Sequence, residues 1–152
     1  MTETVTYPFT SRTYVSLAIA RGIAAAKGHS DITAAHIALG IVQEGANIAV
    51  ASLHRAGVPL RHLRHLLESE LPPNGRPLFG EVVLPTTPGE QEIVQHAVAE
   101  VVKLNDPYVG DEHLLLAILA DPGTSVAQVF YREGITYETF STHLQVLRSG
   151  GS

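Results

Sequence analysis

The sequence repeats itself after a shift of 77 residues, and this internal repeat is the feature that most constrains the fold. Residues 10–67 align without a gap on residues 87–144, with eight identities. Ordinary residue frequencies would give about 3–4 identities by chance, so the identities alone are thin evidence. The apolar pattern repeats as well, at Ile32/Val109, Ile37/Leu114, Val42/Leu119, Leu53/Phe130 and Val58/Ile135. We therefore expect two copies of one helical unit and, by default, two related surface sites. The identical pairs are Thr10/Thr87, Ala20/Ala97, His36/His113, Leu39/Leu116, Ile41/Ile118, Arg55/Arg132, Gly57/Gly134 and Leu67/Leu144.

Composition narrows the class of protein. With 152 residues, 45% of them hydrophobic and 16% charged, the chain is expected to form one compact domain. The net charge of −5 gives no basic footprint for nucleic acid, and no apolar run has the length of a membrane span. The first ten residues do not resemble a signal peptide, so a soluble, cytoplasmic protein is expected. The absence of cysteine excludes disulfides, thiolate catalysis and thiolate zinc sites.

Capping signals divide the chain into eight helices, with almost no strand. The first repeat, about 9–71, is predicted to hold helices at 12–27, 34–44, 46–56 and 59–71. The second repeat, about 87–148, is predicted to hold helices at 88–103, 112–120, 124–133 and 137–147. The expected caps are Thr10 or Ser11, Thr33, Thr87, Gly110 or Asp111 and Thr136, and the expected stops include Gly28, Gly45, Gly57 and Gly134. This pattern predicts an all-α, pseudo-twofold eight-helix bundle.

Two finer features are also predicted. Thr87-Pro88-Gly89-Glu90 is typical of a capping box, in which the Thr hydroxyl and the Glu carboxylate each accept a hydrogen bond from a free amide. Between the repeats, about residues 72–86, the density of proline and glycine forbids helix and indicates a linker. Apolar residues within 78–84 suggest that this linker packs across the domain, with a short strand as an option.

Two paired segments carry a resemblance to a known family. Residues 32–40 read ITAAHIALG and residues 109–117 read VGDEHLLLA. They resemble the double repeat at the N-terminus of Clp AAA+ unfoldases, and most of all the ClpC branch. Phe9-Thr10-Ser11-Arg12, Lys27-Gly28-His29, Glu44-Gly45 and Thr87-Pro88 are similar to other landmarks of that family, so the resemblance covers nearly the whole chain.

The motor of these unfoldases is missing from the sequence. No Gly-rich phosphate loop ending in Lys and Ser or Thr occurs here, so ATPase activity of that type is not expected. If the chain is a complete product, the resemblance implies a stand-alone copy of the domain that collects substrates and adaptors. Such a copy would compete with an intact unfoldase as a decoy. No cofactor is expected.

The resemblance also implies where ligands bind. In ClpC-type domains each repeat is understood to form a pocket for phosphorylated arginine. A carboxylate just before the motif histidine takes the guanidinium, and a threonine and a basic residue near the first helix take the phosphate. The first repeat keeps Thr10 and Arg12 but has Ala35 at the carboxylate position. The second repeat keeps Thr87 and Glu112 but has Gly89 at the basic position.

Structural explanations compete with these site assignments. Thr10 and Thr87 are sufficiently explained as helix caps, and Glu112 lies in a first turn, where the helix dipole favours a carboxylate without any ligand. His36 and His113 are better explained as packed histidines hydrogen-bonded to a neighbouring loop than as catalytic or metal-binding groups.

A metal site has weak support in the sequence, and a catalytic site has none. His54, His62 and His65 form the one local histidine cluster, and surface imidazoles explain it as well as metal ligands do. No nucleophile motif or catalytic carboxylate pair is present. Neither catalytic nor metal residues are therefore assigned.

Three functional hypotheses follow. The leading one is a non-catalytic binding module that captures tagged proteins, adaptors or cyclic-peptide antibiotics, which are ligands known for the family that the chain resembles. Thr86, where ClpC-type domains often carry an aromatic residue, weakens the antibiotic reading. The second hypothesis is a regulatory partner that docks on the unfoldase without reading tags, and the third is a metal-binding or enzymatic role of the histidines.

Overall fold

The computed structural model describes residues 7–77 and 86–150, and this part of the chain contains eight helices and no strand. The helices of the first repeat are α1 (Ser11–Lys27), α2 (Ala34–Glu44), α3 (Ile48–Arg55) and α4 (Leu60–Glu68). Those of the second are α5 (Pro88–Leu104), α6 (Asp111–Leu119), α7 (Ser125–Arg132) and α8 (Tyr137–Arg148). The all-α, two-repeat prediction is confirmed.

The repeat of the sequence is also a repeat of the structure. The same shift of 77 residues places Ser11 on Pro88, Ala34 on Asp111, Ile48 on Ser125 and Leu60 on Tyr137, which are the first residues of corresponding helices. The ends of α1 and α5 also correspond, because Gly28 and Asn105 both adopt the left-handed conformation. The duplication therefore extends to the caps of the helices.

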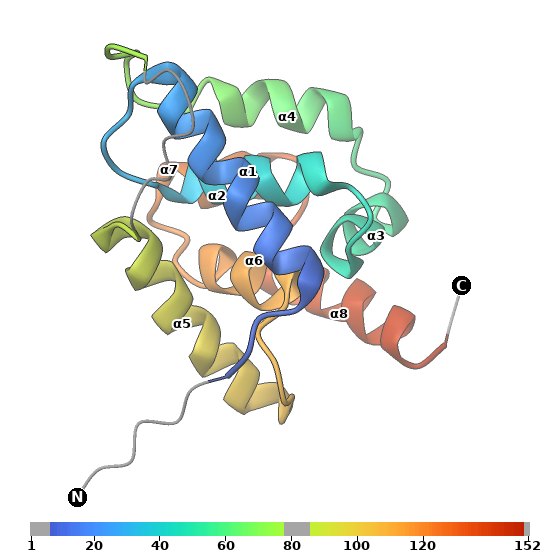
Figure 1. The fold of residues 1–152 in the computed structure, drawn as a ribbon. Helices are drawn as coiled ribbons and strands as arrows, with labels where there is room; N and C mark the ends of the chain where they lie inside the picture. Colours follow the sequence, from blue (N-terminus) through green and yellow to red (C-terminus); the bar gives the residue numbers. More distant parts are fainter. Residues whose placement is uncertain (1–6, 78–85, 151–152) are drawn as a thin grey trace, which may run out of the picture.

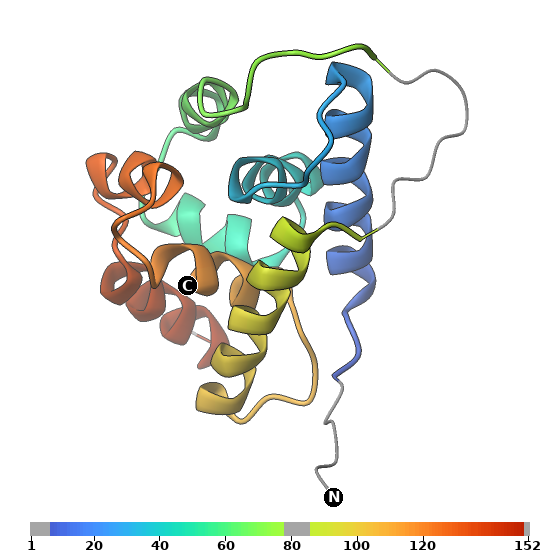
Figure 2. The ribbon, with the colours of Figure 1, turned by 90° about the vertical axis from the view of Figure 1, so that its left-hand side faces the viewer.

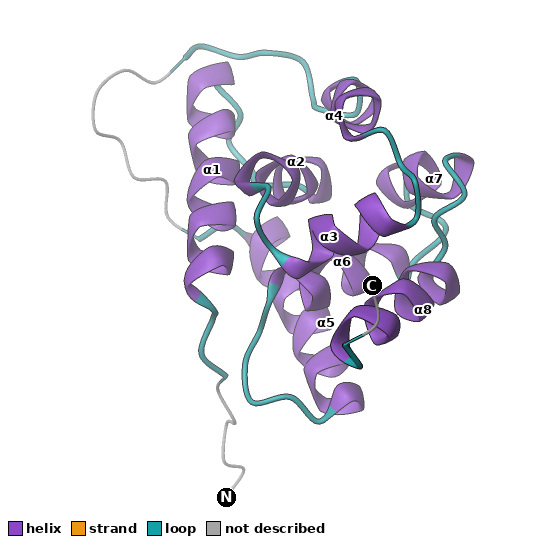
Figure 3. Ribbon diagram, turned by 90° about the vertical axis from the view of Figure 1, so that its right-hand side faces the viewer, coloured by secondary structure: helices purple, strands orange, loops and turns teal. Residues whose placement is uncertain are grey.

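Helices α2 and α6 carry the two repeated motifs and lie at the centre of the bundle (Figure 1). Every residue of α6 is buried, as is the run Ala35–Ile41 of α2. Helix α1 packs on α2 and α5 packs on α6; Figure 2 shows α1 upright at the right and α5 running obliquely through the centre and lower part of the molecule. The secondary-structure view in Figure 3 shows α3 and α8 together on the opposite side of the molecule. Apolar burial on both sides of the motif helices supplies the main stabilisation.

One contact shows how closely the first repeat packs. Gly40 of α2 faces α1, and a Cβ added at Gly40 would lie 2.2 Å from the carbonyl oxygen of Ser16. The equivalent residue of α6 is Ala117. Only glycine permits the approach of α2 to α1, because any side chain would overlap the backbone of α1.

Three local predictions need correction. The third helix begins at Ile48 because Asn47 Oδ1 accepts the Val50 N–H and so caps the helix. The fourth helix ends at Glu68, three residues before the predicted end. In the predicted capping box Thr87 Oγ1 accepts the Glu90 N–H, but the Glu90 carboxylate binds the Arg21 guanidinium at 3.0 and 2.9 Å. That carboxylate joins α5 to α1, which a local motif cannot reveal.

The predicted packing of the linker and its optional strand fall mainly on residues 78–85, which lie outside the described residues. No single helix in the described part of the chain is long and apolar enough to cross a bilayer. Helices α2 and α3 reach that length only as a pair, and they meet at an angle of 85°.

Candidate binding site

A cleft lies where the start of α1 meets the loop that precedes α6. Phe9 and Val109 form a parallel bridge there. The Thr10 N–H donates to the Val109 carbonyl at 3.1 Å, and the Val109 N–H donates to the Pro8 carbonyl at 2.8 Å. The cleft has a volume of about 670 Å³ and is lined by both repeats. We call it the first cleft.

One end of the first cleft can hold an anion. Thr10 caps α1, since its Oγ1 accepts the Thr13 N–H. The first turn of α1 lines the cleft. The guanidinium of Arg12 lies beside the Glu44 carboxylate, with Nη1 3.0 Å from Oε2. The Arg12 side chain is 56% exposed, whereas that of Glu44 is 8% exposed, so water screens this ion pair mainly on the arginine side. A helix N-terminus beside an arginine is a suitable site for a phosphate group.

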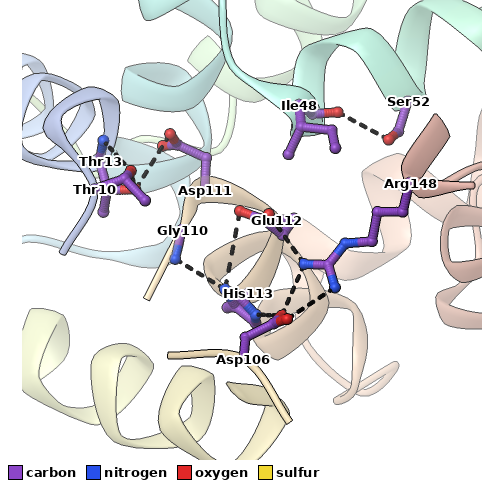
Figure 4. Close-up of polar contacts among 10 residues, drawn as sticks. All are labelled: Thr10, Thr13, Ile48, Ser52, Asp106, Gly110, Asp111, Glu112, His113 and Arg148. Carbon is purple, nitrogen blue, oxygen red and sulfur yellow. Dashed lines mark hydrogen bonds and ion pairs between the residues drawn. The ribbon is translucent and has the colours of Figure 1, made fainter. Parts of the chain in front are cut away.

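The other end presents the carboxylate of Glu112, from the first turn of α6. Glu112 Oε2 accepts a hydrogen bond from Arg148 Nη2 at 3.2 Å, and Oε1 lies 3.9 Å from His113 Nδ1 (Figure 4). The Glu112 side chain is only 4% exposed. Gly110 provides the space for it, because a Cβ at that position would lie 1.9 Å from Oε1. A buried carboxylate of this kind is a planar partner for a guanidinium.

A chain of hydroxyl groups joins the two repeats beneath the cleft. Thr10 Oγ1 donates to Thr13 Oγ1, which in turn donates to Asp111 Oδ2 (Figure 4). Burial raises the pKa of Asp111 to about 6, although the hydroxyls of Ser16 and Thr13 oppose this shift. Burial and the neighbouring Glu112 charge also raise the pKa of Tyr108, so its hydroxyl remains a neutral hydrogen-bond donor. The charge of the cleft thus depends on pH through Asp111.

A second cleft lies at the pseudo-symmetric position, where the start of α5 meets the loop that precedes α2. Its volume is about 250 Å³. Gly89 occupies the position of Arg12, and Ala35 the position of Glu112. Asp31 fills the equivalent space, since its Oδ1 accepts the Gly89 N–H at 3.2 Å. The second cleft therefore lacks the counterparts of Arg12 and Glu112, and its own carboxylates are Asp31, Glu92 and Asp121.

These positions change how the predicted site residues are grouped. Thr10 and Arg12 come from the first repeat and Glu112 from the second, yet all three line the first cleft. Thr87 is not among the residues that line it, and its Oγ1 accepts the amides of both Glu90 and Ile32. We expected one pocket within each repeat, whereas the structure builds each cleft across the repeats. The reason is that the start of α1 bonds to the loop before α6.

The two motif histidines are structural, as the packing interpretation predicted. Both are fully buried. His36 Nδ1 accepts the Thr33 N–H and His113 Nδ1 accepts the Gly110 N–H, so each histidine fixes the start of its helix. Each ring therefore carries its proton on Nε2.

The partners of these Nε2 protons differ between the repeats. His113 donates to Asp106 Oδ2 at 2.7 Å, whereas His36 donates to His29 Nδ1 at 2.8 Å. His29 then carries its own proton on Nε2, and this buried atom has no partner among the described residues. The second repeat satisfies its motif histidine fully, and the first leaves one buried donor unpaired.

The surface histidines do not gather into a site. His62 lies 3.4 Å from Glu133, and no group of three His, Asp or Glu side chains among residues 7–77 and 86–150 could hold a metal ion. The third hypothesis, a metal or enzymatic role, gains no support from this geometry.

Sequence reasoning missed Arg148, Asp106 and Asp111. Burial alone would raise the pKa of Asp106, but the hydrogen bonds from Arg148 and His113 outweigh it and the pKa is lowered. The internal alignment contained a signal for Asp106, because it replaces His29 at the position that meets the motif histidine. Nothing in the sequence pattern signals Arg148, whose counterpart is Leu71.

Comparison with known proteins places this architecture. The sequence model of the family described as "Clp repeat (R) N-terminal domain" matches residues 8–143. The negative regulator of genetic competence ClpC/MecB of Bacillus subtilis is 31% identical over 144 residues, which cover 95% of this chain and 17% of that protein. The chain therefore spans about a sixth of the length of this relative.

Solved structures share the fold. The N-domain of ClpV from Vibrio cholerae superposes with a TM-score of 0.74 at 18% identity, covering 100% of this chain and 97% of that one. A complex of the ClpV N-domain with a VipB peptide superposes with a TM-score of 0.71 at 17% identity, covering 100% and 98%. With its duplicated helices, its buried motif histidines and this match over most of its length, the chain belongs to the Clp repeat N-terminal domain family.

Proposed function

We propose that the chain is a non-catalytic binding module that captures a phosphorylated arginine side chain in the first cleft. One observation carries the proposal: Thr10, Arg12 and Glu112, from opposite repeats, line the same cleft. Its volume of about 670 Å³ is ordinary for a small-ligand site. The start of α1 and Arg12 would bind the phosphate, while Glu112 would bind the guanidinium.

The proposal specifies one ligand per chain. The second cleft offers Gly89 and Ala35 where the first offers an arginine and a carboxylate. Asp31 lies at its helix terminus and would repel a phosphate, whereas the Glu44 carboxylate of the first cleft is paired with Arg12. Each repeat alone has an incomplete set of ligand-binding residues, but the two repeats together would form one complete site in the first cleft.

Calorimetric titration with free phosphoarginine tests this function. We expect binding with a stoichiometry of one, and a loss of at least tenfold in affinity in Glu112→Gln and in Arg12→Ala. Arg64→Ala is the matched control, because Arg64 is an exposed arginine paired with Glu68 outside the cleft. An absence of binding at millimolar phosphoarginine, or a stoichiometry of two, would contradict the proposal.

A third cleft supports a second candidate function, the docking of an apolar peptide, adaptor or cyclic-peptide ligand. This cleft of about 420 Å³ lies between α1 and α5 and is lined by Phe9, Leu17 and Val94. The Arg21–Glu90 ion pair forms part of its wall. The ClpV N-domain, which shares the fold, has been solved with a VipB peptide. A fluorescence titration with labelled apolar peptides, compared between the wild type and Leu17→Glu, would test it.

Capture of a tag also implies competition. A free copy of this chain would then take ligands from a ClpC-type unfoldase and act as a decoy, whereas a regulatory partner would bind the unfoldase itself. Co-purification with a Clp hexamer separates the two, because docking without tags would not change in Glu112→Gln. Loss of co-purification in that variant would argue against the regulatory alternative.

A further inference from the structure

Glu112, which lines the first cleft, already binds a guanidinium of the chain itself. Arg148, the last residue of α8, binds Asp106 through two hydrogen bonds, Nη1 to Oδ1 at 3.1 Å and Nη2 to Oδ2 at 2.8 Å. The same Nη2 reaches Glu112 Oε2 at 3.2 Å (Figure 4). The Arg148 side chain is 20% exposed, so this contact is largely shielded from water. Charge-assisted bonds in such surroundings are among the stronger hydrogen bonds in proteins.

This cluster is confined to the second repeat. The residues equivalent to Arg148, Asp106 and Glu112 are Leu71, His29 and Ala35. Where the first repeat lacks the carboxylate, it also lacks the arginine and the aspartate that anchors it. Arg148 therefore accompanies the Glu112 carboxylate and is not common to the two repeats.

The contact limits what Glu112 can offer a ligand. A carboxylate binds a guanidinium most strongly through two parallel hydrogen bonds, which use both oxygens. Arg148 already holds Oε2. Only Oε1, beside Gly110, remains without a hydrogen bond from another residue of the described chain. A ligand guanidinium that binds through both oxygens must therefore share Oε2 with Arg148 or displace it.

We propose that Arg148 is a specificity-determining residue, an internal guanidinium that competes for Glu112 and weakens the affinity of the first cleft for guanidinium ligands. The phosphate end of the cleft then contributes the larger share of the affinity. This inference rests on the proposed function for the identity of the site, but its test does not require the wild-type chain to bind phosphoarginine.

The experiment removes the competitor. Arginine, lysine, phosphoarginine and phosphoserine are titrated calorimetrically into the wild type, Arg148→Met and Arg148→Lys, at a pH above 7 where Asp111 is ionised. Methionine retains an unbranched side chain close to the aliphatic part of arginine but carries no charge. Lysine preserves the charge next to Asp106 but cannot span both carboxylates with a planar fork. Arg64→Met is the control for the loss of an exposed arginine.

We expect Arg148→Met to bind arginine and phosphoarginine about tenfold more tightly, the value of one charge-assisted hydrogen bond. Phosphoserine has no guanidinium, so its affinity should change by less than about twofold, beyond the effect of the more negative charge that the variant has after losing the arginine. Arg148→Lys should show a smaller gain, and the further change Glu112→Gln should abolish it in both variants. Thermal melting confirms that each variant is folded.

The outcomes separate this inference from the proposed function. If arginine and lysine gain equally in Arg148→Met, the effect is only a change in net charge and the inference is overturned. Unchanged or weaker guanidinium binding in both folded variants overturns it as well. If the wild type fails to bind phosphoarginine but Arg148→Met binds it, the proposed function falls and the inference stands. Failure of every protein to bind overturns both.

Discussion

The first and second clefts occupy equivalent places in a duplicated structure, yet only one retains charged groups suited to a ligand. In the first, Arg12 and Glu112 line the cleft beside the start of α1. In the second, Asp31 binds the corresponding terminus at Gly89. The difference shows that a repeated backbone does not preserve chemistry, because a few side chains decide whether a helix start is a site or a cap.

The same contrast holds in the core. The motif histidine of the second repeat donates to a carboxylate that is itself paired with Arg148, whereas that of the first donates to a neutral histidine. One repeat uses an ionic network at a position where the other uses two imidazoles. Substitutions at these positions measure how far the repeats have diverged.

The largest effect should follow from Asp106→Ala. It leaves the His113 Nε2 proton without its partner and the Arg148 guanidinium with only its contact to Glu112, and the loss of one member of a largely shielded ion pair costs about 3 kcal/mol. His29→Ala, the equivalent change, should cost about 1 to 2 kcal/mol, because it removes a neutral partner. Urea unfolding of both variants measures the difference. Equal losses would mean that the ionic network adds nothing to the second repeat.

The pH dependence of stability should separate His36 from Asp111. Burial and the neighbouring His29 lower the pKa of His36 from 6.5 to about 4, so its contribution is lost as the pH falls through that window. Burial raises the pKa of Asp111 from 3.8 to about 6, so its contribution is present at low pH and is lost as the pH rises through 6. Each displacement is worth about 3 kcal/mol, and the two nearly cancel.

Asp111→Asn removes the contribution of Asp111 to the pH dependence of stability and leaves that of His36. We expect the wild type to keep a nearly flat free energy of unfolding between pH 7 and 4.5, while the variant loses about 2 kcal/mol over that range. Urea midpoints at several pH values provide the measurement, with the exposed Asp121→Asn as control. A parallel decline of the wild type and the variant would show that Asp111 does not oppose the histidine.

Gly89→Ala tests whether the second cleft is closed by contact. A Cβ at Gly89 would lie 2.6 Å from the Ile32 carbonyl oxygen and 2.8 Å from Asp31 Oδ2, so a loss of about 2 kcal/mol is expected. Gly22→Ala is the matched control, because it also replaces a helical glycine by alanine. Nothing lies within 4 Å of a Cβ placed at Gly22. That change should stabilise the protein by about 0.8 kcal/mol. Stabilisation by both variants would mean that the start of α5 is not in close contact with the loop before α2.

The smallest effect concerns the two threonine caps. Thr10→Ala should cost about 1 kcal/mol, the usual value of an N-cap. Thr87→Ala should cost slightly more, because Thr87 Oγ1 also accepts the Ile32 N–H, which would be left unpaired in a buried position. Thermal melting of both variants gives the comparison. A larger loss from Thr10 would place the more important junction between the repeats at the first cleft.

The parts of the fold that could be predicted from the sequence are local ones. Thr10, Thr33, Thr87 and Thr136 identify helix starts because a cap is satisfied within three residues, and the first and second helices were predicted almost to the residue. The start of α3 was missed because the asparagine at position 47 was not recognised as its cap. Periodicity and capping together were sufficient for eight helices.

The arrangement of the site could not be predicted in this way. The residues that line the first cleft were identified one by one, but their grouping depends on the bond between Thr10 and Val109, which are far apart in the sequence. The same holds for Glu90, whose expected local bond gives way to one with Arg21 on another helix. Tertiary pairing of polar side chains has no signature in spacing or periodicity.

The crossing of the repeats at each cleft has a consequence for how such a protein diverges after an internal duplication. Each repeat contributes one half to both sites, so specialising one site requires substitutions in both halves of the gene. A repeat examined alone then looks mixed, keeping Arg12 while losing the counterpart of Glu112. Under the proposed function, the apparent mosaic records two sites that evolved separately after the duplication, one retained and one closed.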